Sequence, residues 1–250
     1  MDEIRKTLSI LKSRWLEAVL IIGLLALSEQ LIYLLPRIFH PRNIRFINMS
    51  IYLVNICVLL FVLLITGGFL RTVYLEQKKR QSLLNLIRIG NHFFSRLFRF
   101  RILYAAVFMF WFGGLYWISQ ITVLSMDSNI FRLVNQAGST IIKFILAKPI
   151  LLVPALIIVG DCDLFKSFGF MRQIRLLKAK PLLAVFLVQI VLSLFFQYFH
   201  NVSAQVSWHF LFYILRSVIL QFLSLSIQIM AVNFVGSSGI ECNREQIVGS

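Results

Sequence analysis

The sequence is poor in the residues that build most catalytic and metal sites. Its 250 residues include 10 acidic side chains, 4 histidines and 3 cysteines. Cys57, Cys162 and Cys242 show no CxxC spacing, which predicts neither a zinc site nor a disulfide framework. The histidines form no HExxH motif, no serine stands in GxSxG, and no glycine-rich phosphate or dinucleotide fingerprint occurs. We therefore expect no complete catalytic site and no cofactor.

Apolar residues, by contrast, dominate the composition. They make up 59% of the chain, while charged residues account for only 14%. Soluble proteins average ~45–50% apolar and ~25% charged residues, so a water-soluble fold has no room to bury this apolar surface. The apolar runs are continuous and do not alternate with period two, which favours helices over barrel strands. The expected fold class is an all-α polytopic membrane protein.

Six apolar blocks are long enough to span a membrane. The ~30 Å hydrocarbon core requires about 20 helical residues. The blocks lie at about 16–35, 47–70, 102–124, 140–160, 181–199 and 209–235. Because the first block is too long for a signal peptide and precedes no small-residue cleavage pattern, it is expected to be a retained span. We predict one membrane domain, residues 1–235, followed by a polar tail, 236–250.

The basic residues are distributed unequally between the two sides of these spans. Of 25 Lys and Arg, 18 fall on the side that carries both termini and 5 on the other. The positive-inside rule then predicts cytoplasmic termini, and we expect a bacterial inner membrane. The formal charge of +15 is attributed to contacts with anionic headgroups, and nucleic acid is not an expected partner.

Two basic segments between the spans resemble interfacial helices. Residues 81–101 alternate apolar and basic faces around a predicted break at Gly90, and residues 164–180 are basic and apolar. Such amphipathic helices lie in the headgroup region and bind anionic phospholipids. The expected headgroup contacts are Lys78, Lys79, Arg80, Arg88, Arg96, Arg99, Arg101, Arg172, Arg175 and Lys178.

Charged residues inside spans are costly and mark candidate functional sites. Glu29 lies toward the outer end of the first span, and Arg216 lies about two turns from the outer end of the last. The two either form a structural ion pair, extend to the outer interface by snorkelling, or line a transport path. Lys148 precedes Pro149, and Pro154 follows, so the fourth span is expected to be kinked. Kinked helices line transporter sites, although most kinks serve only packing.

An acidic pair stands at the inner end of the fourth span. Asp161 and Asp163 form a D-x-D motif beside several basic residues. Carboxylate oxygens in this arrangement bind divalent cations together with phosphate. Helix capping and local charge pairing are the favoured alternative, and no metal is predicted.

Three stretches together resemble a family of membrane domains. They are IRKTLSILKSRWLEAVLIIGLLAL, TGGFLRTVYLEQKKRQSLLNLIRIGNHFFSRLF and PALIIVGDCDLFKSFGFMRQIRLLKAKPLLAVFL. These are similar to segments of six-span bacterial and archaeal families, including the membrane domain that precedes glycerophosphodiester phosphodiesterases. The resemblance implies a six-helix membrane domain. In fused members the chemistry belongs to a separate barrel of about 250 residues, which this sequence does not contain.

The favoured interpretation is a non-enzymatic inner-membrane protein that binds lipid or scaffolds a partner, either a second copy or another membrane protein. A permease subunit with a path near Glu29, Lys148 and Arg216 is the alternative. A membrane-embedded lipid-modifying enzyme that uses Asp161 and Asp163 is a third.

Overall fold

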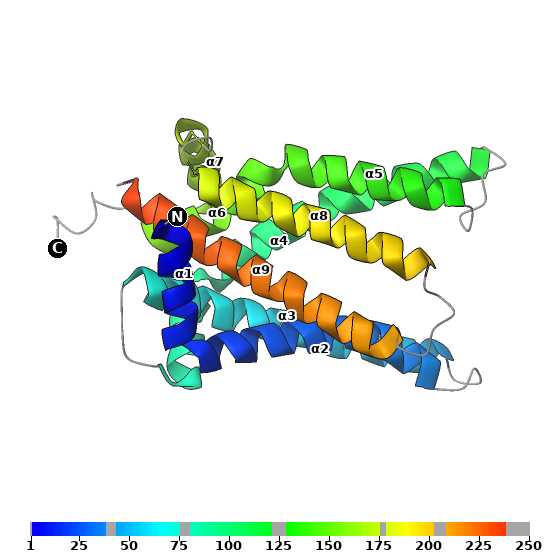
Figure 1. Ribbon diagram of the computed structural model, residues 1–250, viewed down its shortest axis with the longest axis horizontal. Coiled ribbons are helices and arrows are strands. Elements are labelled where there is room, and N and C mark those ends of the chain that lie inside the picture. The colour runs from blue at the N-terminus through cyan, green and yellow to red at the C-terminus, as the bar shows by residue number, and fades with distance from the viewer. Residues whose placement is uncertain are drawn as a thin grey trace.

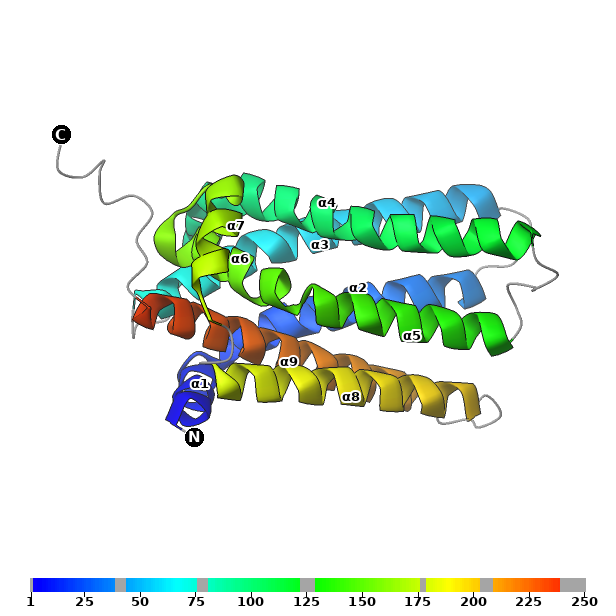
Figure 2. The ribbon, with the colours of Figure 1, turned by 90° about the horizontal axis from the view of Figure 1, so that it is seen from above.

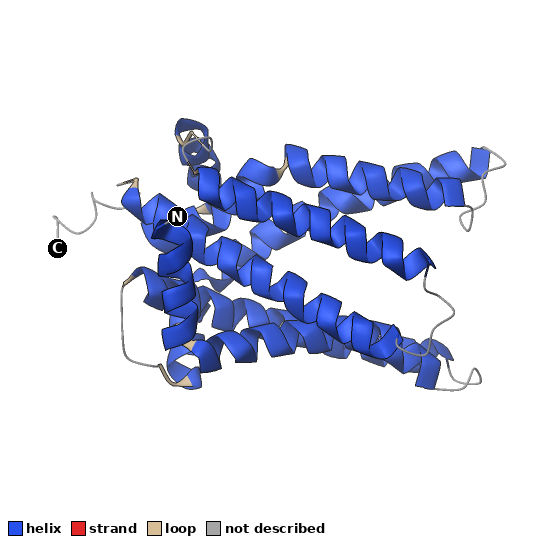
Figure 3. Ribbon diagram, viewed as in Figure 1, coloured by secondary structure: helices blue, strands red, loops and turns tan. Residues whose placement is uncertain are grey.

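The computed structural model describes residues 2–38, 44–75, 81–121, 129–175, 179–202 and 209–238. This part of the chain is helical and contains no strand (Figure 3), which confirms the predicted all-α class. The helices are α1 (Asp2–Ser13), α2 (Trp15–Ile38), α3 (Ile44–Tyr74), α4 (Leu83–Ile121), α5 (Asn129–Ile145), α6 (Ala147–Gly160), α7 (Leu164–Gln173), α8 (Lys180–Val202) and α9 (His209–Ser237).

The long helices run side by side as a bundle. The helix α9 lies between α2 and α8, and α3 packs against both α2 and α4 (Figure 1). Turned by 90°, the molecule shows α6 in the middle of the bundle, close to α7 (Figure 2). The helices α1 and α7 and the C-terminal end of α9 lie together at one end, which we call the α7 end.

Several of these helices are long and apolar enough to cross a membrane. Three qualify singly, over Leu53–Tyr74, Leu83–Ser119 and Phe212–Ser237. Val134–Ile145 and Ala147–Gly160 qualify together as a bent pair, and Lys180–Phe196 forms a shorter apolar helix. Many large apolar side chains on these helices are exposed, such as Phe110 at 83%. Because water would penalise such a surface, the chain is a helical membrane protein.

The predicted kink in the fourth span is confirmed. The helix breaks between Ile145 and Ala147, and the two parts meet at 49°. Pro149 has no N–H to donate to the carbonyl of Ile145, which explains a break at this point. The helix α6 that follows is almost entirely apolar, and Leu152, Val153 and Leu156 have 0% exposure. A helix of this composition is buried in protein or in lipid, and here protein surrounds α6, which forms the core.

The predicted break at Gly90 is wrong, because α4 continues through it as one helix. Gly90 serves instead to bring α4 against α3. A Cβ at this position would stand 1.8 Å from the carbonyl oxygen of Leu64. On α3, a Cβ at Gly68 would stand 2.0 Å from the carbonyl oxygen of Leu86. Only glycine at both positions allows the two backbones to approach this closely.

Candidate functional site

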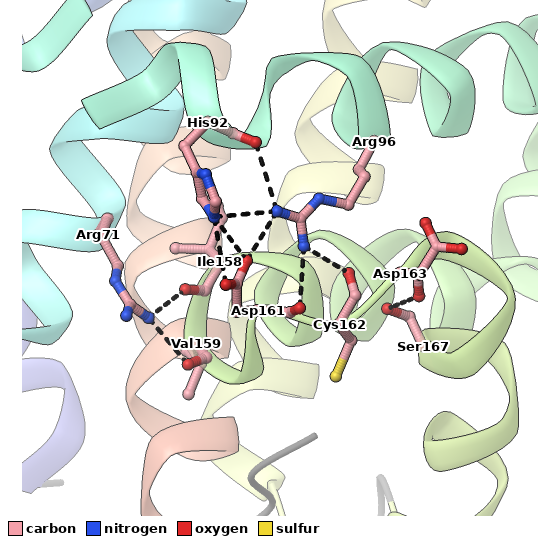
Figure 4. A network of polar contacts seen from close by, with 9 residues as sticks. All are labelled: Arg71, His92, Arg96, Ile158, Val159, Asp161, Cys162, Asp163 and Ser167. Atoms are coloured by element: carbon pink, nitrogen blue, oxygen red, sulfur yellow. Dashed lines mark hydrogen bonds and ion pairs between the residues drawn. The ribbon is translucent and has the colours of Figure 1, made fainter. Parts of the chain in front are cut away.

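Two arginines from neighbouring helices bind the C-terminal end of α6. Arg71 of α3 donates to the carbonyl oxygens of Ile158 at 2.6 Å and Val159 at 2.9 Å. Arg96 of α4 donates to the carbonyl oxygens of Asp161 at 2.9 Å and Cys162 at 3.2 Å (Figure 4). The last carbonyls of a helix have no partner within the helix, and cations are favourable at that end. These contacts satisfy the carbonyls inside an apolar core.

The side chain of Asp161 completes this arrangement. Its backbone is left-handed, with φ 52°, which turns the chain out of α6. Its carboxylate contacts Nε2 of His92 at 2.9 and 3.2 Å and Nη2 of Arg96 at 2.7 Å. Partial burial raises the pKa of Asp161, but hydrogen bonds and charge from Arg96 and His92 outweigh burial and lower the pKa below its ordinary value. We call Arg71, His92, Arg96 and Asp161 the α6 clamp.

The two carboxylates of the acidic pair have different surroundings. Asp161 forms an ion pair with Arg96 and contacts the ring of His92, which is local charge pairing of the kind that the favoured interpretation describes. Asp163 is exposed and stands at the N-cap of α7, but its side chain makes no capping hydrogen bond. The Ser167 hydroxyl donates instead to the Asp163 backbone carbonyl at 2.9 Å (Figure 4). Within the described residues no three His, Cys, Asp or Glu side chains gather as a metal site.

The expected headgroup cations fall into four groups. The first group is exposed and consists of Arg88, Arg99, Arg172 and Arg175. Arg96 belongs to the α6 clamp, where it pairs with Asp161. Arg101 is exposed but lines a cavity. Lys78, Lys79, Arg80 and Lys178 lie outside the described residues.

A second charged pair is buried near the α7 end. Arg14 donates to the Glu17 carboxylate at 2.5 and 3.0 Å, and the two side chains are 3% and 8% exposed. Arg14 also donates to Oγ1 of Thr72 at 2.5 Å and lies over the ring of Phe69. Glu17 accepts from the backbone N–H of Gln81 at 2.9 Å. The pair therefore joins the start of α2 to α3 and to the entry of α4.

The sequence alone does not predict the buried Arg14–Glu17 pair, nor the contacts of Arg71 and His92 in the α6 clamp. The i, i+3 spacing of Arg14 and Glu17 was the one available signal, since such residues face each other on a helix. Nothing local to Arg71 or His92 distinguishes them from neighbouring polar residues.

The three intramembrane charges do not meet. Glu29 accepts a hydrogen bond from Ser217, and no ion pair with Arg216 occurs. The Nε of Arg216 is buried and has no hydrogen-bond partner within the described structure. Lys148 donates to the carbonyl oxygen of Arg172 at 3.5 Å, beside α7. No hydrogen bond or ion pair links these three side chains to one another, and the path near them stays a prediction.

A cavity of about 560 Å³ lies within the bundle. Its walls come from α2, α3, α4, α6, α8 and α9 and are mainly apolar. The polar side chains that line it are Thr66, Arg101, Tyr104, Gln189, Gln221, Ser224 and Gln228. Its volume is in the range of ~300–1,000 Å³ that small-molecule sites occupy. No local sequence pattern predicts this site, because its lining residues come from six separate helices.

The cysteines differ from their prediction at one position. Cys57 is an exposed free thiol. Cys162 is 1% exposed and disulfide-bonded, so the prediction that the cysteines form no disulfide is wrong there.

Exposed apolar helices around a mostly apolar core define the class of this protein as a helical integral membrane protein. Comparisons of the chain with protein-family models, with curated proteins and with solved structures find no match. The resemblance to the phosphodiesterase-associated membrane domain therefore stays a prediction.

Proposed function

We propose that the chain crosses a bacterial inner membrane six times and that its α7 end faces the cytoplasm. The six spans would be α2, α3, α4, the bent pair α5 and α6, α8, and α9. The helix α1 and the end of α9 lie at the same end of the bundle, as an even number of spans requires. The excess of Lys and Arg on that side supports its cytoplasmic orientation.

The function that we propose is non-enzymatic binding of anionic phospholipid at the α7 end. The observation that carries it is a surface on which exposed cations stand beside exposed apolar side chains. On α4, Arg88 is exposed near Leu84, which is 79% exposed. On and after α7, Arg172 and Arg175 are exposed, and Phe165 is 81% exposed. Apolar groups that enter the acyl region and cations at headgroup level together favour anionic leaflets.

Lipid dependence of the purified protein tests this function. The chain would be extracted in mild detergent, stripped of lipid, and titrated with phosphatidylglycerol or phosphatidylcholine while its thermal unfolding is followed. We expect phosphatidylglycerol to restore a higher melting temperature and phosphatidylcholine to have little effect. Replacing Arg88, Arg172 and Arg175 together by Gln should reduce this difference. If removal of lipid leaves melting temperature and assembly unchanged, the proposal is wrong, and a scaffolding role remains.

Transport is a second candidate, and one observation favours it. The buried Nε of Arg216 has no hydrogen-bond partner within the described residues, and its charge acts on Lys143 of α5. The Glu29 carboxylate accepts a hydrogen bond from the hydroxyl of Ser217, the residue that follows Arg216. Uncompensated charges inside a membrane protein commonly face a water-filled path. In a Cys57→Ser background, Glu29→Cys and Arg216→Cys should then react with a membrane-impermeant maleimide. Lack of reaction at both positions would exclude a hydrated path.

A further inference from the structure

We propose that the cavity binds one acyl chain of an anionic phospholipid and that Arg101 pairs with the lipid phosphate. This inference rests on the proposed lipid-binding function and assigns a specific site to it. It is distinct from the exposed cations of the α7 end, because it names a cavity inside the bundle.

The position of Arg101 sets it apart from the other arginines of α4. It lies five residues after Arg96, about 7.5 Å further along the helix axis. Arg96 is engaged by Asp161, and Arg99 does not line the cavity. Arg101 lines the cavity and makes no hydrogen bond or ion pair with any residue in the described ranges. Tyr104, one turn further on, also lines the cavity.

Arg101 is exposed at the edge of a cavity whose walls are mainly apolar, and a charge in such surroundings is favoured by an anionic partner. Arg matches the geometry of phosphate with paired hydrogen bonds. The protein supplies no carboxylate to Arg101 in the part that the structure describes. An anion bound in the cavity would provide this partner.

A polar stripe on α9 provides a second feature of the site. Gln221, Ser224 and Gln228 are spaced by three and four residues and therefore share one face of the helix. All three line the cavity, and their side chains make no hydrogen bond to other described residues. Donors of this kind suit the glycerol and ester oxygens of a lipid, which lie between its phosphate and its acyl chains.

The remaining walls fit an acyl chain. Along α3 the lining extends from Ile56 to Leu70, which corresponds to about 21 Å of helix. One leaflet contributes about 15 Å of the ~30 Å hydrocarbon core, so the cavity is long enough for a whole chain. Ile56 and Ile102 line the cavity and are 54% and 53% exposed. They leave an apolar surface that an acyl chain would cover.

Native mass spectrometry of the full-length protein tests the assignment with two matched pairs of variants. Arg101→Gln removes the cavity charge, and Arg99→Gln makes the same change on the same helix outside the cavity. Ala105→Phe fills the cavity, where Ala105 is exposed, and Ala106→Phe alters the neighbouring position that does not line it. The probes are phosphatidylglycerol, phosphatidylcholine and oleate. Circular dichroism and melting temperature monitor folding of each variant.

We expect one tightly held phosphatidylglycerol per chain and weaker retention of phosphatidylcholine. Arg101→Gln should reduce affinity about tenfold because it removes a charge-assisted hydrogen bond, and Arg99→Gln less than about twofold. Ala105→Phe should abolish the tight complex, and Ala106→Phe should retain it.

Equal losses in Arg101→Gln and Arg99→Gln would overturn the cavity site and leave surface binding at the α7 end intact. Preferential uptake of oleate would assign a free fatty acid to the cavity and would also overturn the proposal. Absence of any response to phosphatidylglycerol in the unaltered protein would refute the proposed function itself.

Discussion

The guanidinium of Arg96 contacts Asp161 at two points, the backbone carbonyl of Asp161 at 2.9 Å and the carboxylate of Asp161 at 2.7 Å. One guanidinium thus joins the helix α4 to both the backbone and the side chain at which α6 ends. Together with Arg71 on α3, it fixes the end of α6, which is the most buried helix of the bundle. The α6 clamp therefore determines where the core helix stops and where α7 begins.

Stability should depend on the charge of Asp161. Its folded pKa lies below the unfolded value, so its charged form contributes stability at neutral pH, and this contribution is lost as pH falls through the folded pKa. The expected window lies below about pH 4, the ordinary range of an Asp carboxyl. Melting temperature in detergent, measured from pH 6 to pH 3, should fall more steeply in the unaltered protein than in Asp161→Asn.

Asp163→Asn is the matched control, because its carboxylate is exposed and forms no ion pair with the described residues. At pH 6 we expect Asp161→Asn to lower the melting temperature and Asp163→Asn to leave it nearly unchanged. Identical acid profiles for Asp161→Asn and the unaltered protein would show that the clamp contact contributes nothing.

Loss of the buried carboxylate at position 17 should destabilise the bundle. Glu17→Gln leaves the Arg14 guanidinium buried without its counter-charge, which typically costs ~3–5 kcal/mol. The affected contacts join α2, α3 and the entry of α4. Denaturant or thermal unfolding in detergent measures the change.

Glu3→Gln, at an exposed position of α1, should have little effect on the same measurement. Similar losses from Glu17→Gln and Glu3→Gln would contradict a structural role for the buried pair.

The close contact of α3 and α4 predicts a strong dependence on glycine. Gly90→Ala places a methyl group against the Leu64 carbonyl, where the backbones must move apart. Overpacking of this kind costs ~1–3 kcal/mol even when side chains rearrange. Here the new methyl group meets backbone atoms of α3, which cannot rotate away as a side chain would. Gly113→Ala is the control on the same helix, because a Cβ there meets nothing within 4 Å.

In the control we expect unchanged or higher stability, since Ala favours a helix by about 1 kcal/mol over Gly. Thermal unfolding of the two variants gives the comparison. A Gly90→Ala protein as stable as Gly113→Ala would show that α3 and α4 do not approach as described.

Topology gives a prediction independent of stability. With six spans, reporters fused to the two ends of the chain should both report the cytoplasm. Green fluorescent protein, which is fluorescent in the cytoplasm, and alkaline phosphatase, which is active outside it, distinguish the sides. Reporters that land on opposite faces would require an odd number of spans and would refute the six-span arrangement.

Much of the fold was predictable, whereas little of the candidate site was. Continuous apolar blocks predicted the long helices, and Pro149 predicted the bend that separates α5 from α6. The prediction for Gly90 is wrong, because the local sequence around a glycine is the same in two cases. The glycine can break a helix, or it can lie within a continuous helix and allow a second helix to pack closely against it. Its function depends on Leu64, which is remote in sequence.

The sequence by itself determined that this is a helical membrane protein. Each helix satisfies its own backbone hydrogen bonds, so length and apolar composition are sufficient to identify it. Only the tertiary structure decided what each cation does. Arg96 is held in the clamp, Arg99 is exposed and Arg101 lines the cavity. These three residues lie within two turns of one helix. They differ because only Arg96 faces the carboxylate of Asp161, which follows α6, and only Arg101 faces the cavity that several helices enclose.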